Sequence, residues 1–329
     1  MSNIEQTKLL EKLADLIEQN ARTPAEALAI TKEVVARSDS TDSLQYLTEA
    51  NSESRKGFVR RFAPKDLHML CKYRTYFESW LDMPIDQIGK IEGVFVSSSE
   101  KRQEKPAGWL AYMPICALET EVSFIVSCIP EWHDDLQETL YCSTVSDTFS
   151  QLKEFVEKRK NDALVESFHN IYGLANLNPQ IDTSSAVPLD YHHYGQYCEF
   201  MKKAYPSIYS LIEHEPAITK DYREMVEKKT HFCIIENDKI VSLTESENIS
   251  NKPKGIISLG INTLKEYRRN GYASFACAAF VKQSLLNDLL PLWQCDFDNA
   301  ASQALAEKIG FCHIGNVYSV STLLESWKK

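Results

Sequence analysis

The sequence lacks several features that would assign it at once to a broad class of protein. None of its cysteines form a CxxC pair, which argues against a zinc ribbon. Neither a Walker A loop nor a GxGxxG stretch occurs, so nucleotide-binding folds lose their main sequence support. No apolar run approaches the length of a membrane span, and the N-terminal "MSNIEQTKLLEKLADLIEQN" lacks the apolar core of a signal peptide. We therefore expect no metal site, no membrane partner and a cytoplasmic location, while export without a cleaved signal stays open.

Positive charge is also scarce. The chain has 36 lysines and arginines against 46 aspartates and glutamates, which gives a formal net charge of −10. Nucleic-acid-binding proteins usually show a basic face, so we expect no nucleic-acid partner. A cationic partner is mildly favoured, although most acidic proteins are simply soluble.

The nine cysteines are odd in number and irregular in spacing. Several lie in apolar runs, such as Cys233 in "HFCII" and Cys277 in "SFACAAF". We interpret them as buried reduced thiols, which indicates a reducing compartment.

A chain of 329 residues with 43% hydrophobic and 25% charged residues is long enough for about two globular domains. The stretch "GLANLNPQIDTSSAVPLD" concentrates Gly, Pro, Asn and Ser, and it predicts a boundary between a domain over 1–180 and another over 181–329. In the first half, the pattern predicts helices at 4–19 and 23–37. Strands are expected at 90–99, 108–118 and 121–129, and a further helix near 145–165.

The second half has a different order of elements. Helices are expected at about 189–204 and 208–228, followed by strands at 231–237 and 239–246 that meet in a hairpin turn at Asn237 and Asp238. A strand at 255–263, a helix to Asn287, a strand at 291–297, a helix at 299–310 and a strand at 311–320 follow. This order predicts an α+β fold with one mostly antiparallel sheet flanked by helices, preceded by an α+β N-terminal domain.

The stretch "YRRNGYASFACAAF" begins at Tyr267 and places charge and a glycine before a predicted helix. A helix N-terminus exposes unpaired backbone N–H groups and a positive dipole end, so it is a natural anion site. Gly271 lets the backbone approach an anion closely, and Lys265, Arg268 and Arg269 add positive charge. The alternative is an ordinary loop that leads into a buried helix.

Two motifs resolve these alternatives. The spacing Arg268-x-x-Gly271-x-Ala273 resembles the Q/R-x-x-G-x-G/A motif of the GNAT superfamily of acyl-CoA-dependent N-acetyltransferases. A second stretch, "LWQCDFDNAASQALAEKIGF", resembles the later motif of that family. Asn299 is also a good N-cap, and Gly310 is a good residue to end a helix. The alternative is therefore that these residues only begin and end a helix and have no role in binding a cofactor. Because both motifs occur in the right order and context, the resemblance is to a GNAT subgroup with an additional N-terminal domain.

The resemblance implies an enzyme that transfers the acetyl group of acetyl-CoA, its co-substrate, to an amine by direct attack in a ternary complex. The splayed strands of that family grip the pantetheine arm through backbone groups, and the arginine-glycine loop holds the pyrophosphate. The cofactor-binding residues that the resemblance implies are Ile261, Thr263, Arg268, Arg269, Asn270, Gly271, Tyr272, Ala273, Asn299 and Ser302.

The catalytic residues depart from the family pattern. Many members place a tyrosine, the general acid, where this chain has Ala306. We expect Ser302 to act as a substitute acid, with Tyr318 or solvent as alternatives. The strand at 255–263 carries no carboxylate, so Glu245 and Glu247 on the preceding strand are the nearest candidates for a general base. Alternatively, these glutamates are simply charged residues at the solvated end of a strand. The same two interpretations apply to Asp296 and Asp298.

The segment 190–209 is rich in aromatic residues and carries adjacent histidines. A packed helix face explains such a segment, but the resemblance places the first helices over the acceptor groove. It therefore makes Tyr191, His193 and Tyr209 candidate contacts for the amine substrate, a small molecule or a peptide.

A second function of a different class stays open. The chain could be a catalytically weak acyl-CoA-binding protein whose first domain binds a partner. Residues 1–180 contain no usable motif, and both a degenerate GNAT copy and an unrelated accessory domain fit them. The sequence does not identify the acceptor amine or the oligomeric state.

Overall fold

The computed structural model describes residues 72–84, 92–104, 112–159, 164–206, 222–227, 229–246 and 255–322. The strands are β1 (Gly93–Ser98), β2 (Tyr112–Glu119), β3 (Ser123–Cys128), β4 (Val165–Leu174), β5 (Val187–Pro188), β6 (Phe232–Glu236), β7 (Lys239–Glu245), β8 (Ile256–Thr263), β9 (Leu290–Asp296) and β10 (Phe311–Thr322). The helices are α5 (Arg74–Leu81), η3 (Glu100–Gln103), α7 (Pro130–Leu140), α8 (Val145–Arg159), η4 (Tyr191–His193), α9 (Tyr194–Ala204), η6 (Lys265–Tyr267), α12 (Tyr272–Leu286) and α13 (Ala300–Ile309).

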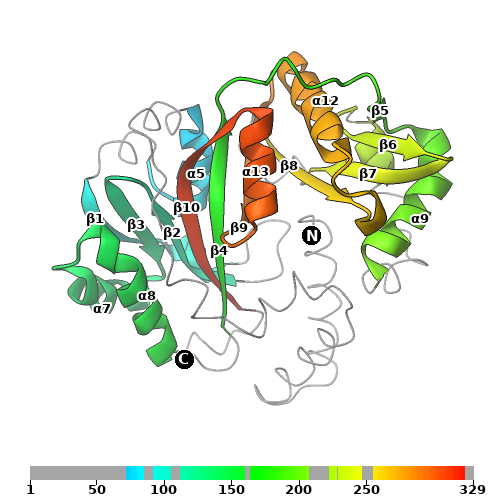
Figure 1. Cartoon of the computed structure of the whole chain (residues 1–329). Helices are drawn as coiled ribbons and strands as arrows, with labels where there is room; N and C mark the ends of the chain where they lie inside the picture. Colours follow the sequence, from blue (N-terminus) through cyan, green and yellow to red (C-terminus); the bar gives the residue numbers. More distant parts are fainter. Residues whose placement is uncertain are drawn as a thin grey trace, which may run out of the picture.

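The described strands form one mixed sheet in the order β1-β3-β2-β10-β4-β9-β8-β7-β6-β5 (Figure 1). Only the β1–β3 and β8–β9 pairs are parallel among the ladders of this sheet. The predicted α+β fold with a mostly antiparallel sheet is therefore confirmed. The predicted hairpin is also confirmed, because Asn237 and Asp238 both have positive φ (48° and 59°), as a type I′ turn between two strands requires.

Several elements differ from the prediction. The long helix expected near 145–165 ends at Arg159 as α8, and Val165 already begins strand β4. β4 was not expected, because the buried polar residues Glu166 and Asn170 hide its apolar alternation. Helices α5 and α7 were not predicted either, and the helix expected from about 189 starts at Tyr194 after the short turn η4. The helices expected at 4–19 and 23–37 lie outside the described residues, as do Tyr209 and Glu247.

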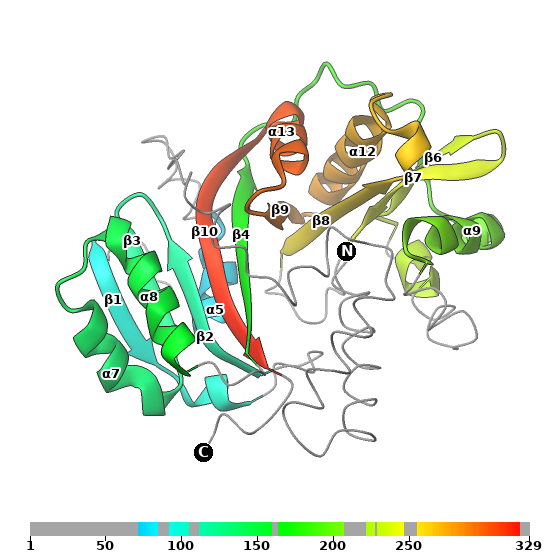
Figure 2. The same cartoon turned by 60° about the horizontal axis from the view of Figure 1, so that its bottom comes forward.

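Helices cover both faces of the sheet. On one face, Ile257 and Leu259 of β8 pack in a core with Phe280 of α12 and Ile309 of α13. Side chains alternate along a strand, so Ile256 points to the opposite face, where it packs with the residues of α5. Helix α9 covers β7 on that second face. Figures 1 and 2 both show α12 and α13 next to each other over the sheet.

Strands from both halves of the sequence share the sheet. β10 hydrogen bonds to β2 on one side and to β4 on the other, and β4 also pairs with β9. The sheet therefore runs without a break across the region where a domain boundary is predicted. The boundary at residue 180 stays a prediction.

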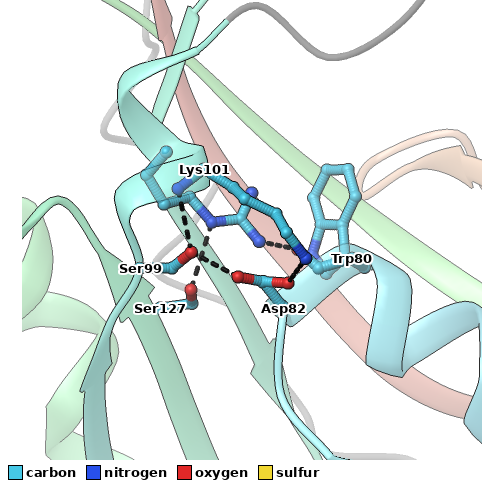
Figure 3. A network of polar contacts seen from close by, with 6 residues as sticks. Trp80, Asp82, Ser99, Lys101 and Ser127 are labelled. Carbon is cyan, nitrogen blue, oxygen red and sulfur yellow. Dashed lines mark hydrogen bonds and ion pairs between the residues drawn. The ribbon is translucent and has the colours of Figure 1, made fainter.

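Buried polar contacts fix α5 against the neighbouring strands (Figure 3). The buried Arg102 of η3 donates to Ser127 Oγ of β3 (3.1 Å) and to the Trp80 carbonyl of α5.

Tyr73, just before α5, donates its hydroxyl to the Pro291 carbonyl of β9 (2.6 Å) and accepts the Leu174 N–H of β4 (2.7 Å). Because Tyr73 joins β9 to β4, the sheet is held firmly next to the place where β8 and β9 meet.

The cysteines of the described residues are free thiols, and most of them are buried. Burial raises the pKa of Cys233 to about 12 and raises the pKa of Cys277 well above its usual range. Cys233 and Cys277 are thus buried and neutral at ordinary pH. The prediction of buried thiols is wrong for Cys142, which is exposed, and Cys198 and Cys312 are only half-buried. In the described ranges, no helix combines the length and the apolar character that crossing a bilayer requires.

Candidate functional site

Strands β8 and β9 part in the middle of the sheet. They pair in parallel only from Ile256 with Leu290 to Leu259 with Trp293. Beyond Leu259, β8 continues alongside β7, whereas β9 continues alongside β4 (Figure 1). The last residues of β8 therefore have a paired strand on one side only in the described part of the sheet.

The backbone of β8 points two residues toward this open side. Leu264 N–H donates to the Val241 carbonyl of β7 (2.9 Å), so these two residues form a hydrogen-bonded pair. Hydrogen-bonded and non-hydrogen-bonded pairs alternate along an antiparallel ladder. Ile261 and Thr263 therefore fall at non-hydrogen-bonded positions. Their N–H and C=O groups point away from β7.

The start of β8 supports the same assignment. Leu290 N–H of β9 donates to the Gly255 carbonyl (2.7 Å), so Gly255 faces β9. Every second residue of a strand shares this orientation, so Ile261 and Thr263 face the same side. After β9 has turned away, the backbone groups of Ile261 and the N–H of Thr263 are placed to pair with an extended ligand, as an added strand would, while the Thr263 carbonyl already accepts a hydrogen bond from Arg268.

The loop after β8 turns sharply into α12. Arg269 and Gly271 both have positive φ (67° and 82°). A Cβ on Gly271 would lie 3.1 Å from Cζ of Phe275, so both the backbone conformation and the space favour glycine here. No side chain caps the N-terminus of α12. Its first N–H groups, including those of Tyr272 and Ala273, therefore lack helical partners and lie at the positive end of the helix dipole.

Side chains of the loop are organised around this N-terminus. Arg268 Nε donates to the Thr263 carbonyl (3.0 Å), which leaves the outer guanidinium nitrogens of Arg268 for another acceptor. Asn270 Nδ2 donates to the Tyr267 carbonyl (3.2 Å) and holds the loop. Lys265, Arg268 and Arg269 are exposed, so a bound anion would meet several positive charges.

Tyr272 has a partner of its own. Its hydroxyl donates to Glu236 Oε1 of β6 (2.9 Å), and this hydrogen bond raises the pKa of Tyr272. The phenol is therefore neutral at ordinary pH. Its contact joins the start of α12 to the end of β6.

Ser302 lies where β9 separates from β8. Asn299 Oδ1 accepts the Ser302 N–H (3.0 Å), which confirms Asn299 as the N-cap of α13. Trp293 Nε1, on the last β9 residue that pairs with β8, donates to Ser302 Oγ (3.1 Å). The indole can only donate, so it occupies an acceptor site of the Ser302 hydroxyl, which also forms a side-chain hydrogen bond with Cys295 of β9. Ala306 is fully buried one turn further along α13.

Glu245 lies at the same place on the opposite face. It is the register partner of Gly260, the first β8 residue beyond the β9 pairing. A Cβ on Gly260 would lie 3.4 Å from the Glu245 Cβ and 3.8 Å from its Oε2, so the carboxylate lies over this glycine. Glu245 is only 6% exposed, which excludes a solvated strand end.

A residue that the sequence analysis did not single out contacts this carboxylate. The Tyr205 hydroxyl lies 3.0 Å from Glu245 Oε1 and 3.3 Å from Oε2. Tyr205 follows the last residue of α9 and is itself buried. Its only sequence signal was its place in the aromatic segment, immediately before Pro206.

The other predicted residues have structural partners at the start of α9. His193 Nδ1 accepts the Asp190 N–H (3.2 Å), and Tyr191 donates its hydroxyl to Glu227 Oε1 (3.3 Å). Helix α9 rises about 1.5 Å per residue and separates this end from Tyr205 by about 16 Å. The structure thus does not bring Tyr191 and His193 together with Glu245.

Two further candidates also lie in ordinary contacts. The Tyr318 hydroxyl donates to Glu166 Oε2 (3.0 Å) in a core formed by β2, β4 and β10, away from β8. Asp296 pairs with His169 of β4 at 3.2 Å. Neither contact reaches the loop before α12.

Comparison with known proteins places a family match on this part of the chain. Residues 220–320 match the family model of GNAT acetyltransferases. An uncharacterized N-acetyltransferase of Bacillus subtilis, YdfB, is 29% identical over 109 residues, which cover 31% of this chain and 41% of the relative. The match thus spans less than half of that relative's length.

Solved structures with partial overlap include two acetyltransferase-like proteins. A GNAT-family acetyltransferase of Colwellia psychrerythraea overlaps with a TM-score of 0.43 at 14% identity, covering 60% of this chain and 76% of its own. A GCN5-related N-acetyltransferase-like protein of Streptococcus suis overlaps with a TM-score of 0.40 at 14% identity, covering 78% and 98%.

Proposed function

We propose that this chain, which carries a GNAT acetyltransferase domain over residues 220–320, transfers the acetyl group of acetyl-CoA to an amine by direct attack in a ternary complex. The observation that carries the proposal is the parting of β8 and β9 beside the uncapped N-terminus of α12. The edge of β8 beyond Leu259 provides backbone groups for an extended ligand. The N-terminus of α12 provides N–H groups that bind phosphates. Coenzyme A contains both.

The residues near the parted strands divide the binding of acetyl-CoA between them. The backbone groups of Ile261 and Thr263 pair with the amides of the pantetheine arm. The first N–H groups of α12, at Tyr272 and Ala273, bind the pyrophosphate. The remaining members of the proposed cofactor site are Arg268, Arg269, Asn270, Gly271, Asn299 and Ser302.

Two side chains are placed to handle protons from opposite faces of the sheet. The thioester supplies the acetyl group, and the amine nitrogen bonds to its carbonyl carbon as the C–S bond breaks. Glu245 takes the proton that the amine loses, because its buried carboxylate lies over Gly260 where the strands part. Ser302 gives a proton to the departing sulfur and regains one from solvent, since Trp293 occupies only an acceptor site of its hydroxyl.

The acceptor amine enters from the face that carries Glu245. Tyr191, His193 and Tyr209 stay proposed contacts for the acceptor amine. Tyr191 and His193 lie farther along α9 from Tyr205 and Glu245, and Tyr209 lies outside the described residues. The part up to residue 180 is proposed to be an accessory domain that shares the sheet with the transferase part, 181–329. The free thiols fit a cytoplasmic protein.

A second candidate function is an acyl-CoA-binding protein with little catalytic activity. Ala306 favours it, because this position is fully buried and holds no proton donor. Release of free CoA thiol, measured with a panel of amines, separates the two functions. Steady thiol release that depends on both substrates supports the transferase, whereas binding without release supports the second candidate.

Acetyl-CoA is expected to bind the full chain and to raise its melting temperature, because a ligand selective for the native state stabilises it. In a Gly271→Asp variant, the affinity for acetyl-CoA should fall at least about tenfold below that of a Gly271→Asn variant, because Asp places a negative charge beside the phosphates. Isothermal titration on both variants measures the difference.

Asn and Asp form a matched pair for this experiment. Both tolerate positive φ and have nearly the same shape, so strain at Gly271 affects them equally. Equal affinities of two folded variants would show that the loop before α12 does not hold the phosphates. A wild-type chain whose melting temperature ignores millimolar acetyl-CoA would contradict the proposed function itself.

An Arg268→Ala variant is expected to raise the KM for acetyl-CoA by roughly tenfold while kcat changes little. The lost charge-assisted contact, worth about 1.5–3 kcal/mol gross, is present equally in the ground and transition states. Steady-state kinetics at varied acetyl-CoA measures both constants. Lys282→Gln makes the same charge change near the other end of α12 and should leave KM unaltered. A fall in kcat with an unchanged KM would contradict the proposed orientation of the cofactor.

A further inference from the structure

The end of helix α9 is fixed by its sequence. Tyr205 is the C-cap residue, and its N–H still donates to the Met201 carbonyl (2.8 Å). Pro206 follows, and a residue before proline is disfavoured in the helical region. Tyr205 accordingly leaves the helix with φ −142° and ψ 60°. This turn carries its side chain from the helix end into the core between α9 and β7.

The side chain of Tyr205 is buried in a hydrophobic core. It lies in a core with Phe200 and Met201 of α9, Leu243 of β7 and Leu264 after β8. Tyr205 is 6% exposed. The phenol therefore has little freedom to rotate away from the hydrogen-bond distance that it keeps to the Glu245 carboxylate.

The contact with Glu245 is chemically one-sided. An ionised carboxylate can only accept, so the Tyr205 hydroxyl is the donor and its proton lies between the two oxygens at 3.0 and 3.3 Å. Donation to the charged form favours that form over the neutral acid. It also fixes the rotamer of Glu245.

We infer that Tyr205 is a positioning residue for Glu245: it holds the buried carboxylate over Gly260 and keeps it ionised so that it can take the proton of the acceptor amine. The inference rests on the proposed function of Glu245. It adds a residue that the family motifs in the sequence do not contain. Tyr205 acts through Glu245 and does not itself touch the reacting atoms.

Other titratable groups lie around Glu245. Cys233 of β6 and Tyr222 belong to the same core as Tyr205, and burial raises the pKa of both thiol and phenol, so both stay neutral near pH 7. His231, before β6, lies 3.1 Å from Ser246 Oγ through its Nε2. On β8, Gly260 and Asn262 bring no titratable side chain to this place. Among the described residues, His231 is therefore the group that an experiment must separate from Glu245.

The test compares Tyr205→Phe with Tyr222→Phe. Both changes remove one buried hydroxyl from the same aromatic core, but the Tyr222 hydroxyl donates to the Asp190 carbonyl and not to Glu245. In Tyr205→Phe, the acidic limb of the kcat/KM profile should move up by about one pH unit, because the charged carboxylate loses its donor. Turnover on that limb should fall roughly tenfold and recover toward the wild-type value at high pH. KM for acetyl-CoA should stay unchanged, and Tyr222→Phe should keep the wild-type profile.

A second measurement does not depend on turnover. Carbon-13 carboxyl NMR of Glu245, assigned with the Glu245→Gln variant, reports its titration directly in the full chain. The midpoint should rise by about one pH unit in Tyr205→Phe and stay fixed in Tyr222→Phe. Equal titration midpoints of Glu245 in the wild type and in Tyr205→Phe would overturn the inference. An acidic limb of the kcat/KM profile that persists in Glu245→Gln would also overturn it, because that limb would then belong to another group such as His231. If the NMR shift occurs while no amine is acetylated, the positioning contact stands and the proposed function fails.

Discussion

A Gly310→Ala variant is expected to be destabilised by about 4 kcal/mol or more, which is a large part of the total stability of a typical domain. Gly310 ends α13 with a φ of 115°, a conformation that L side chains rarely adopt. An added Cβ would lie 1.8 Å from the Asn176 carbonyl oxygen, so the backbone there must move. The move would strain hydrogen bonds that the N–H groups of Ala175 and Asn176 donate to the Gly310 carbonyl (3.1 and 3.3 Å). Urea unfolding measures the loss as a lower midpoint.

Gly195→Ala is the matched control for this prediction. Gly195 lies in the first turn of α9, and a Cβ there meets nothing within 4 Å. Since alanine favours a helix over glycine, this variant should be unchanged or slightly more stable. A Gly310→Ala variant that unfolds at the wild-type urea concentration would show that the close approach of 175–178 to the end of α13 is wrong.

The Glu245→Gln variant is expected to lose between about 10²- and 10⁴-fold in kcat at neutral pH, the range that a general base contributes. Glutamine keeps the shape and an acceptor oxygen for Tyr205, but it cannot take a proton from the amine. The affinity for acetyl-CoA should stay close to that of the wild type, because Glu245 lies on the face opposite α12 and α13. Initial rates of thiol release at saturating acetyl-CoA measure the loss.

The other half of the sheet provides a control for Glu245. Glu166 of β4 is also buried, and it also accepts a tyrosine hydroxyl, that of Tyr318 at 3.0 Å. A Glu166→Gln variant therefore makes the same chemical change in a similar setting away from the parted strands. Its kcat should match the wild type. Equal losses in both variants would assign the effect of Glu245→Gln to stability, and a silent Glu245→Gln would remove Glu245 from the mechanism.

The sequence was most informative where local chemistry decides the structure. Asn237 and Asp238 predicted a turn that needs two residues of positive φ, and both adopt it. Asn299 predicted the start of α13 for the same local reason. Gly271 predicted a loop that leads into a helix, and α12 begins at the next residue. In each of these places, the residues that fix the backbone lie within a few positions of one another.

Contacts between distant segments were beyond the sequence analysis. β4 was missed because its inward-facing positions include Glu166 and Asn170, whose partners Tyr318 and Phe297 lie far along the chain. The opening between β8 and β9 depends on how far two strands stay in register, which no local pattern encodes. Tyr205 was missed for a similar reason. Its aromatic segment predicted packing, and only the fold brings its hydroxyl to Glu245.

The position of β10 also has a consequence for how the chain folds on the ribosome. β10 is synthesised after the other described strands, yet it lies between β2 and β4, which are made much earlier. Until residues 311–322 leave the ribosome, β2 and β4 each have an edge without its final neighbour, and such edges are prone to pair with other chains. Closing the sheet then requires contacts between residues far apart in sequence, which fold slowly. The nascent protein is therefore expected to need protection by chaperones until β10 has been made.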